Sequence, residues 1–148
     1  MKRFLVLVTC AAFVGAGCFK SSATVTSPTG SASILGGTWQ TIAHIPGANP
    51  AQSCTNFTWA VTSFTGSTGS GTFSATCFGN VQIAGSAAGT LNANNISWSA
   101  NATATVQGMP PCEIKLSGTA TLQTDRIVIP YSGSTCLGDV DGTETVKK

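Results

Sequence analysis

The sequence predicts an all-β domain built as an antiparallel up-and-down barrel of about eight strands. Apolar and polar residues alternate with a period of two through much of residues 35–148, and no stretch shows a helical period. The segments are separated by short links of Gly, Asn, Ser and Pro, which are typical of hairpin turns. Because short links join neighbouring antiparallel strands, we expect the strands to follow one another in sequence order.

Residues 96–106 give the clearest strand, with apolar residues at every second position and Ser, Thr or Asn between them. Residues 113–122 repeat this alternation, with Gly at one of the apolar positions. Such segments predict a sheet with one face in water and the other packed. By the same criterion we expect further strands at residues 37–43, 55–64, 71–78, 81–91, 126–131 and 140–146.

Eight strands can close into a barrel whose interior is filled by side chains or holds one small ligand, and closure leaves no exposed edge. A two-sheet β-sandwich is the alternative, because seven or eight short strands would also build it. A sandwich usually needs longer crossing links, and only residues 43–53 form a long one. The barrel is therefore the preferred architecture.

The N-terminus has the pattern of an export signal, with Lys2 and Arg3 ahead of an apolar run over residues 4–16. That run is too short to span a membrane, which takes roughly 20 residues. It ends in Val14-Gly15-Ala16-Gly17-Cys18, which resembles the lipobox of bacterial lipoproteins, although lipoboxes usually carry Leu, Val or Ile in place of Gly15. The resemblance implies a signal peptide over residues 1–17 and lipidation of Cys18. The alternative is an ordinary secretory signal with an incidental cysteine.

The lipoprotein resemblance also implies a location. The protein would be held in the bacterial cell envelope by its lipid anchor, and Phe19 after the cysteine favours the outer membrane of a Gram-negative cell. Residues 18–34 are then the lipidated cysteine and a Ser- and Thr-rich tether, a composition that buries too little apolar area to fold. Residues 35–148 remain as the barrel domain.

Charge is scarce in this chain, which has seven Lys and Arg against five Asp and Glu and a net charge of +2. Removing the signal peptide takes Lys2 and Arg3 with it and leaves five basic and five acidic residues. A surface with so little positive charge has no footprint for phosphates, so nucleic acid is excluded as a partner.

Four cysteines follow Cys18, and in an oxidising compartment they predict two disulfides. Three pairings are possible. The spacing favours Cys54 with Cys77 and Cys112 with Cys136, because each pair brackets one predicted hairpin. Zinc is the rival interpretation, but the chain has no close-spaced cysteine pair and a single histidine.

The second of these hairpins needs care with its register. A two-residue turn at residues 124–125 pairs Leu122 with Ile127 and sets Cys136 opposite Glu113, one place from Cys112. We therefore expect a β-bulge near Gly133 to align the two sulfurs.

Gly37-Thr38-Trp39 resembles the Gly-x-Trp motif that opens the first strand of lipocalins and avidins. These families share an eight-stranded up-and-down barrel and bind small molecules in its mouth, so the resemblance implies that fold. In lipocalins a basic residue near the last strand often covers the tryptophan, and here none is available until Lys147 and Lys148. No ligand residue is carried over from the families, and Trp39 can equally be an ordinary core aromatic.

Catalytic chemistry has few candidates. His44 is the only histidine and falls in the expected 43–53 loop, with no second histidine or free thiol for nucleophilic catalysis. Glu113 is expected to face outward and Asp125 to lie in a turn, so no carboxylate pair is evident. Asp139 and Asp141 could bind calcium, but the rest of an EF-hand loop is missing, and a solvated turn is the default. We predict no enzyme activity, metal or cofactor.

Two binding functions remain. The favoured one is a protein-binding envelope module, such as an adhesin or an inhibitor of a lytic enzyme or protease, because Ala100, Ala102, Ala104 and Gly118 leave room that large facing side chains could fill. The alternative is a binder of a small apolar ligand, which would require an apolar pocket of roughly a few hundred Å³ with a few convergent polar groups. Its expected lining residues are Trp59, Trp98, Phe57, Phe73 and Tyr131.

Overall fold

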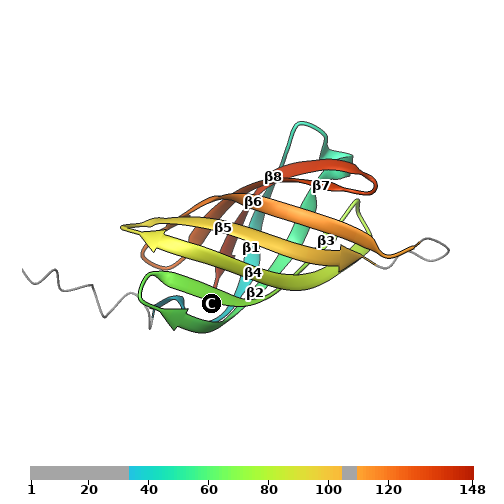
Figure 1. Ribbon diagram of the computed structural model, residues 1–148. Helices are drawn as coiled ribbons and strands as arrows, with labels where there is room; N and C mark the ends of the chain where they lie inside the picture. Colours follow the sequence, from blue (N-terminus) through green and yellow to red (C-terminus); the bar gives the residue numbers. More distant parts are fainter. Residues whose placement is uncertain (1–33, 105–109) are drawn as a thin grey trace, which may run out of the picture.

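The computed structural model describes residues 34–104 and 110–148, and within them the chain forms a closed antiparallel barrel of eight strands in sequence order (Figure 1). The last strand pairs with the first, so the all-β barrel prediction is confirmed and the sandwich is excluded. The strands are β1 (Gly37–Pro46), β2 (Cys54–Thr65), β3 (Thr68–Cys77), β4 (Val81–Asn92), β5 (Asn95–Ala104), β6 (Cys112–Leu122), β7 (Ile127–Thr135) and β8 (Gly138–Lys147). A short 3-10 helix, η1 (Pro50–Gln52), lies between β1 and β2. No helix in the described ranges is long and apolar enough to cross a membrane.

The expected alternation between the two faces holds along β5. Trp98, Ala100, Ala102 and Ala104 are buried, while the residues between them are exposed. The last two residues of the strand expected at 96–106 lie outside the described residues, as do Cys18, the expected signal peptide and nearly all of the expected tether.

Strand β1 is longer than expected, and this corrects the placement of His44. The strand continues to Pro46 because its pairing with β8 continues through Ile45, so His44 is a strand residue and pairs with Glu144. A register shift between Thr41 and Ala43 marks a bulge in β1. Because of this bulge, Thr41 and His44 lie on the same, inner face of the strand.

Glycines let neighbouring strands approach closely enough to close a barrel with a packed interior. A Cβ at Gly71 would lie 1.9 Å from the carbonyl oxygen of Ala60, and one at Gly85 would lie 2.0 Å from that of Asn101. No other residue fits such a contact, so glycine is required where these neighbouring strands approach each other.

The β6–β7 hairpin has the expected start and an unexpected end. Leu122 pairs with Ile127 as predicted, and the same register extends to the pair of Lys115 and Ser134. The expected bulge near Gly133 is therefore wrong. Instead, β7 ends at Thr135, and Cys136 reaches its partner from the turn that follows the strand.

The barrel has two ends of different construction. The tryptophan end contains the turns β2–β3, β4–β5 and β6–β7 together with Leu35, and the C-terminus lies there, at the left of Figure 1. The disulfide end contains the bonds Cys54–Cys77 and Cys112–Cys136, the two pairs that the spacing predicts, together with the 47–53 loop. These two names are kept below.

Candidate functional site

The tryptophan end contains an apolar pocket with a volume of about 80 Å³. Its walls come from all eight strands, and no charged side chain lines it. The large side chains around it are Leu35, Trp39, Trp59, Phe64, Leu91 and Trp98. Alanine and glycine occupy several facing positions, among them Ala87, Gly89 and Ala120, which is why space remains. The candidate site is therefore an apolar chamber in the mouth of the barrel.

Leu35 closes part of this mouth. Its side chain is buried although it precedes the first strand, and its carbonyl oxygen accepts a hydrogen bond of 2.9 Å from Trp39 Nε1. The ammonium group of Lys148 donates to the carbonyl oxygen of Ile34 and lies 5.0 Å from the centre of the Trp39 ring. A basic side chain therefore covers Trp39, and it comes from Lys148, one residue beyond β8.

Three aromatic rings in contact lead from the pocket into the core. Trp59 and Trp98 meet edge to face with centroids 4.9 Å apart, and Phe73 lies 5.1 Å from Trp59. The indole N–H groups of Trp59 and Trp98 are buried and have no hydrogen-bond partner among the residues that the structure describes. A buried donor without an acceptor is costly, so this pair is a distinguishing feature of the site.

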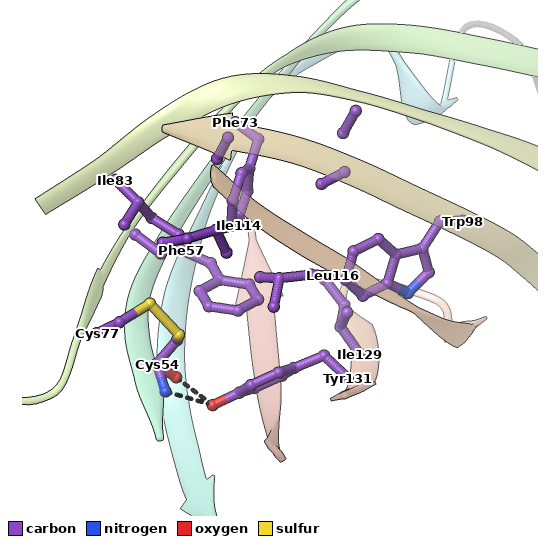
Figure 2. Packing of buried hydrophobic residues seen from close by; sticks show 14 of the residues in the cluster. Cys54, Phe57, Phe73, Cys77, Ile83, Trp98, Ile114, Leu116, Ile129 and Tyr131 are labelled. Carbon is purple, nitrogen blue, oxygen red and sulfur yellow. Dashed lines mark hydrogen bonds between the residues drawn. A yellow bond between two sulfur atoms is a disulfide. The ribbon is translucent and has the colours of Figure 1, made fainter. Parts of the chain in front are cut away.

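Below the pocket the interior is packed, as Figure 2 shows for Phe57, Phe73, Ile114 and Leu116. The expectation of a filled barrel therefore holds for this part of the interior and fails at the tryptophan end. Of the five residues expected to line a ligand site, Trp59 and Trp98 lie at this pocket. Phe57, Phe73 and Tyr131 instead belong to the packed core beneath the pocket.

Tyr131 ties β7 to the start of β2. Its hydroxyl accepts a hydrogen bond of 2.6 Å from the backbone N–H of Cys54 and donates one of 2.5 Å to the carbonyl oxygen of the same residue (Figure 2). Burial raises the pKa of Tyr131 to about 12, so the phenol stays protonated and can keep donating. This contact fixes the strand end that carries the Cys54–Cys77 disulfide.

A buried carboxylate, Glu144, is the functional group that the sequence did not point to. It faces the interior from β8 and is fully buried, with hydrogen bonds to Nδ1 of His44 and, at 2.5 Å, to the hydroxyl of Thr41. Burial raises the pKa of Glu144, against the opposing effect of hydrogen bonds from Thr41, His44 and Thr55. The alternation of Val140, Gly142, Glu144 and Val146 in the sequence was the available signal that Glu144 faces inward.

The His44–Glu144 contact links β1 to β8, the two strands that close the barrel. His44 is a quarter exposed, and within the described chain its ring bonds to Glu144 alone. Thr41 in turn accepts a hydrogen bond of 2.7 Å from the backbone N–H of Phe57 on β2. The cluster can hold a proton, and it joins three strands through side chains.

The two aspartates considered for calcium are placed differently. Asp141 accepts a hydrogen bond of 3.1 Å from the backbone N–H of Ala48 and lies against Gly47, where a Cβ would meet its carboxylate. It thus fastens the 47–53 loop. Asp139 pairs with Ser134 next to the turn of the β7–β8 hairpin. In the two described ranges no group of three or more His, Cys, Asp or Glu side chains is positioned to hold a metal ion.

Comparison with protein-family models, with curated proteins and with solved structures found no match to this chain. The functional argument therefore depends on the geometry of the barrel and of its two ends.

Proposed function

We propose that this protein is a non-enzymatic binder of a small apolar ligand, held in the bacterial envelope by a lipid on Cys18. The observation that carries the proposal is the apolar pocket at the tryptophan end, whose walls include Trp39, Trp59 and Trp98. Ligand sites are typically concave and largely apolar with a few convergent polar groups. The sequence alone favours a protein-facing surface, on the premise of a packed barrel with little cavity. The pocket of about 80 Å³ with aromatic walls favours a small ligand instead.

The size of the pocket limits the ligand. A cavity of roughly 150 Å³ binds benzene, whereas this pocket measures about 80 Å³ with Leu35 in its mouth. A single aromatic ring would therefore enter by displacing the Leu35 side chain. Leu35 stands outside the barrel ladder, and its segment is held by contacts with Trp39 and Lys148, so it can move without breaking strand pairing.

The envelope location is supported by the two disulfides, because such bonds persist in oxidising compartments. Cys18 precedes Leu35 by 17 residues, which at full extension span at most about 60 Å. The tether from a lipidated Cys18 would thus join the barrel domain at the tryptophan end. It would keep the mouth of the pocket near a membrane, where apolar molecules concentrate.

Toluene is a suitable first probe, with binding followed through tryptophan emission. Ala87 lines the pocket and Ala84 lies exposed on the outer face of the same strand, so Ala87→Leu should fill the pocket and weaken binding at least about tenfold. Ala84→Leu is the matched control and should bind as the wild type does. Leu35→Ala should bind more tightly. Equal binding by the Ala87→Leu and wild-type proteins would refute the site.

A further inference from the structure

The rim of the tryptophan end carries most of the positive charge in the described part of the chain. The β6–β7 turn contains Asp125 and Arg126. On the neighbouring strand, β8 ends in Lys147, which Lys148 follows. Asp125 accepts hydrogen bonds of 2.9 Å from Arg126 Nε and 3.1 Å from Lys147 Nζ, so one exposed carboxylate serves two exposed cations. The rim side chains therefore carry three positive charges against one negative, and a terminal carboxylate on Lys148 would leave the balance positive.

The opposite end of the barrel is negative. Glu144 is fully buried in the interior and presents no charge at the surface of either end. The other carboxylates and the remaining ammonium group of the described ranges lie in the half of the barrel nearer the disulfide end, and they are Glu113, Asp139, Asp141 and Lys115. Three negative charges thus stand there against one positive. The barrel is polarised along its axis, with its positive end at the mouth of the pocket.

Apolar side chains lie beside the positive charge. Ile34 is half exposed, and Phe64 and Leu91 are only partly buried where they line the pocket. The disulfide end also exposes apolar side chains, Ile45 and Leu137, so apolar exposure alone does not distinguish the two ends. Charge does distinguish them, because an anionic surface attracts the tryptophan end and repels the disulfide end.

We propose that the tryptophan end is a docking surface for a membrane that contains anionic phospholipids, with the basic side chains at the headgroups and the mouth of the pocket toward the acyl chains. Each Lys or Arg near such a surface strengthens binding roughly fivefold. The tether joins the domain at this same end, ahead of Leu35, so anchoring and docking favour one orientation. An apolar ligand could then pass from the bilayer into the pocket without crossing water. The inference uses the envelope location of the proposed function and does not depend on the ligand.

Amide signals of the full chain beside lipid nanodiscs test the orientation. The discs consist of phosphatidylcholine alone or of equal parts of phosphatidylcholine and phosphatidylglycerol, and each contains a trace of a gadolinium-chelating lipid that broadens nearby signals. Gly66 and Ala93 report on turns at the tryptophan end, and Gly79 reports on the β3–β4 turn at the disulfide end. We expect Gly66 and Ala93 to broaden in the anionic discs alone, and Gly79 to stay sharp in both. Any contribution of the N-terminus is the same in the two kinds of disc.

Charge variants test the cause of the docking. Arg126→Gln/Lys147→Gln removes two positive charges and leaves the contacts of Lys148 with Ile34 and Trp39 in place. We expect this variant to need about tenfold more anionic disc, or more, for the same broadening. Lys115→Gln, at an exposed position on β6, is the control and should behave as the wild type does.

Broadening that is equal at both ends, equal in both kinds of disc, or unchanged by the double substitution would refute the docking surface. Toluene binding is measured without discs, so a failure of docking and a failure of the proposed ligand are distinguishable.

Discussion

The two ends of the barrel are built from the same eight strands but differ in what closes them. The disulfide end has two covalent links, the Tyr131 contact with both backbone groups of Cys54, and the 47–53 loop held by Asp141. The tryptophan end has Leu35, the Lys148 ammonium group and the apolar pocket. The comparison shows that the covalent links and the loop contacts lie at one end, and under the proposed function the other end would admit the ligand.

Removing the Cys54–Cys77 disulfide should cause the largest loss in the free energy of unfolding. The bond closes a loop between residues 23 apart in sequence, which in the chain-entropy model is worth about 3 kcal/mol. We expect Cys54→Ala/Cys77→Ala to lose about that much free energy of unfolding in urea, and to bind toluene normally while folded. Unchanged stability would show that the covalent link is not what closes this end.

Tyr131→Phe should have the next largest effect. It deletes only the hydroxyl and leaves the buried N–H and C=O of Cys54 without this partner, at a cost of roughly 1–3 kcal/mol. Urea unfolding measures the loss. Ser132→Ala, at an exposed position next to it on β7, is the matched control and should be close to wild type. If Tyr131→Phe is as stable as the control, the Tyr131 hydroxyl does not stabilise the disulfide end.

Glu144→Gln should flatten the dependence of stability on pH. Burial raises the pKa of Glu144 above its ordinary value of 4.5, so the folded state binds this proton more tightly than the unfolded state. Its contribution is therefore fully present below pH 4.5 and is lost as pH rises through the raised folded pKa. We expect urea midpoints of the wild type to fall across this window relative to those of Glu144→Gln.

Glu113→Gln is the control for that titration, because Glu113 lies exposed on the outer face of β6. Its profile should follow that of the wild type. His44 on β1 and Tyr131 on β7 face the carboxyl group, so a His44→Gln background shows how much of the slope belongs to the pair. If the urea midpoints of the wild type and Glu144→Gln change with pH in parallel, this pH dependence does not come from Glu144.

Lys148→Met should have the smallest effect. The ammonium group lies over Trp39 at the exposed mouth, where such a cation–π contact is worth about 0.5–1 kcal/mol. We expect a loss of this size in urea unfolding, together with faster amide exchange at Gly36 and Gly37. Lys147→Met, the neighbouring exposed lysine, should leave that exchange as it is. Equal exchange in both variants would mean that Lys148 does not hold the mouth.

Much of the fold could be predicted from the sequence, because the period-two alternation and the short links determine which strands pair. The position of each side chain along the barrel axis could not be predicted, and this is why only Trp59 and Trp98 of the five residues expected to line a ligand site lie at the pocket. Cys54 and Phe57 are both buried although they are three residues apart, because the β2–β3 register shifts between Thr55 and Thr58, where Asn56 adopts a left-handed φ of +56°. No sequence pattern identifies such a bulge in advance.

Glu144 and His44 show a second limit. Each was visible in the sequence, but their contact depends on the closure of β1 on β8 and on the bulge after Thr41. Both are long-range features, and a polar residue in an alternating strand does not by itself reveal the partner that makes its burial tolerable.

The most direct test of the central claim is a map of backbone amide shifts in the wild-type chain as toluene is added. Binding at the tryptophan end predicts shifts confined to the pocket residues, including Trp39, Val61, Ala87 and Trp98, with Cys54, Tyr131 and Glu144 unmoved. Shifts confined to the disulfide end, or the absence of any shift at the pocket, would contradict the division of the barrel into a stable end and a binding end.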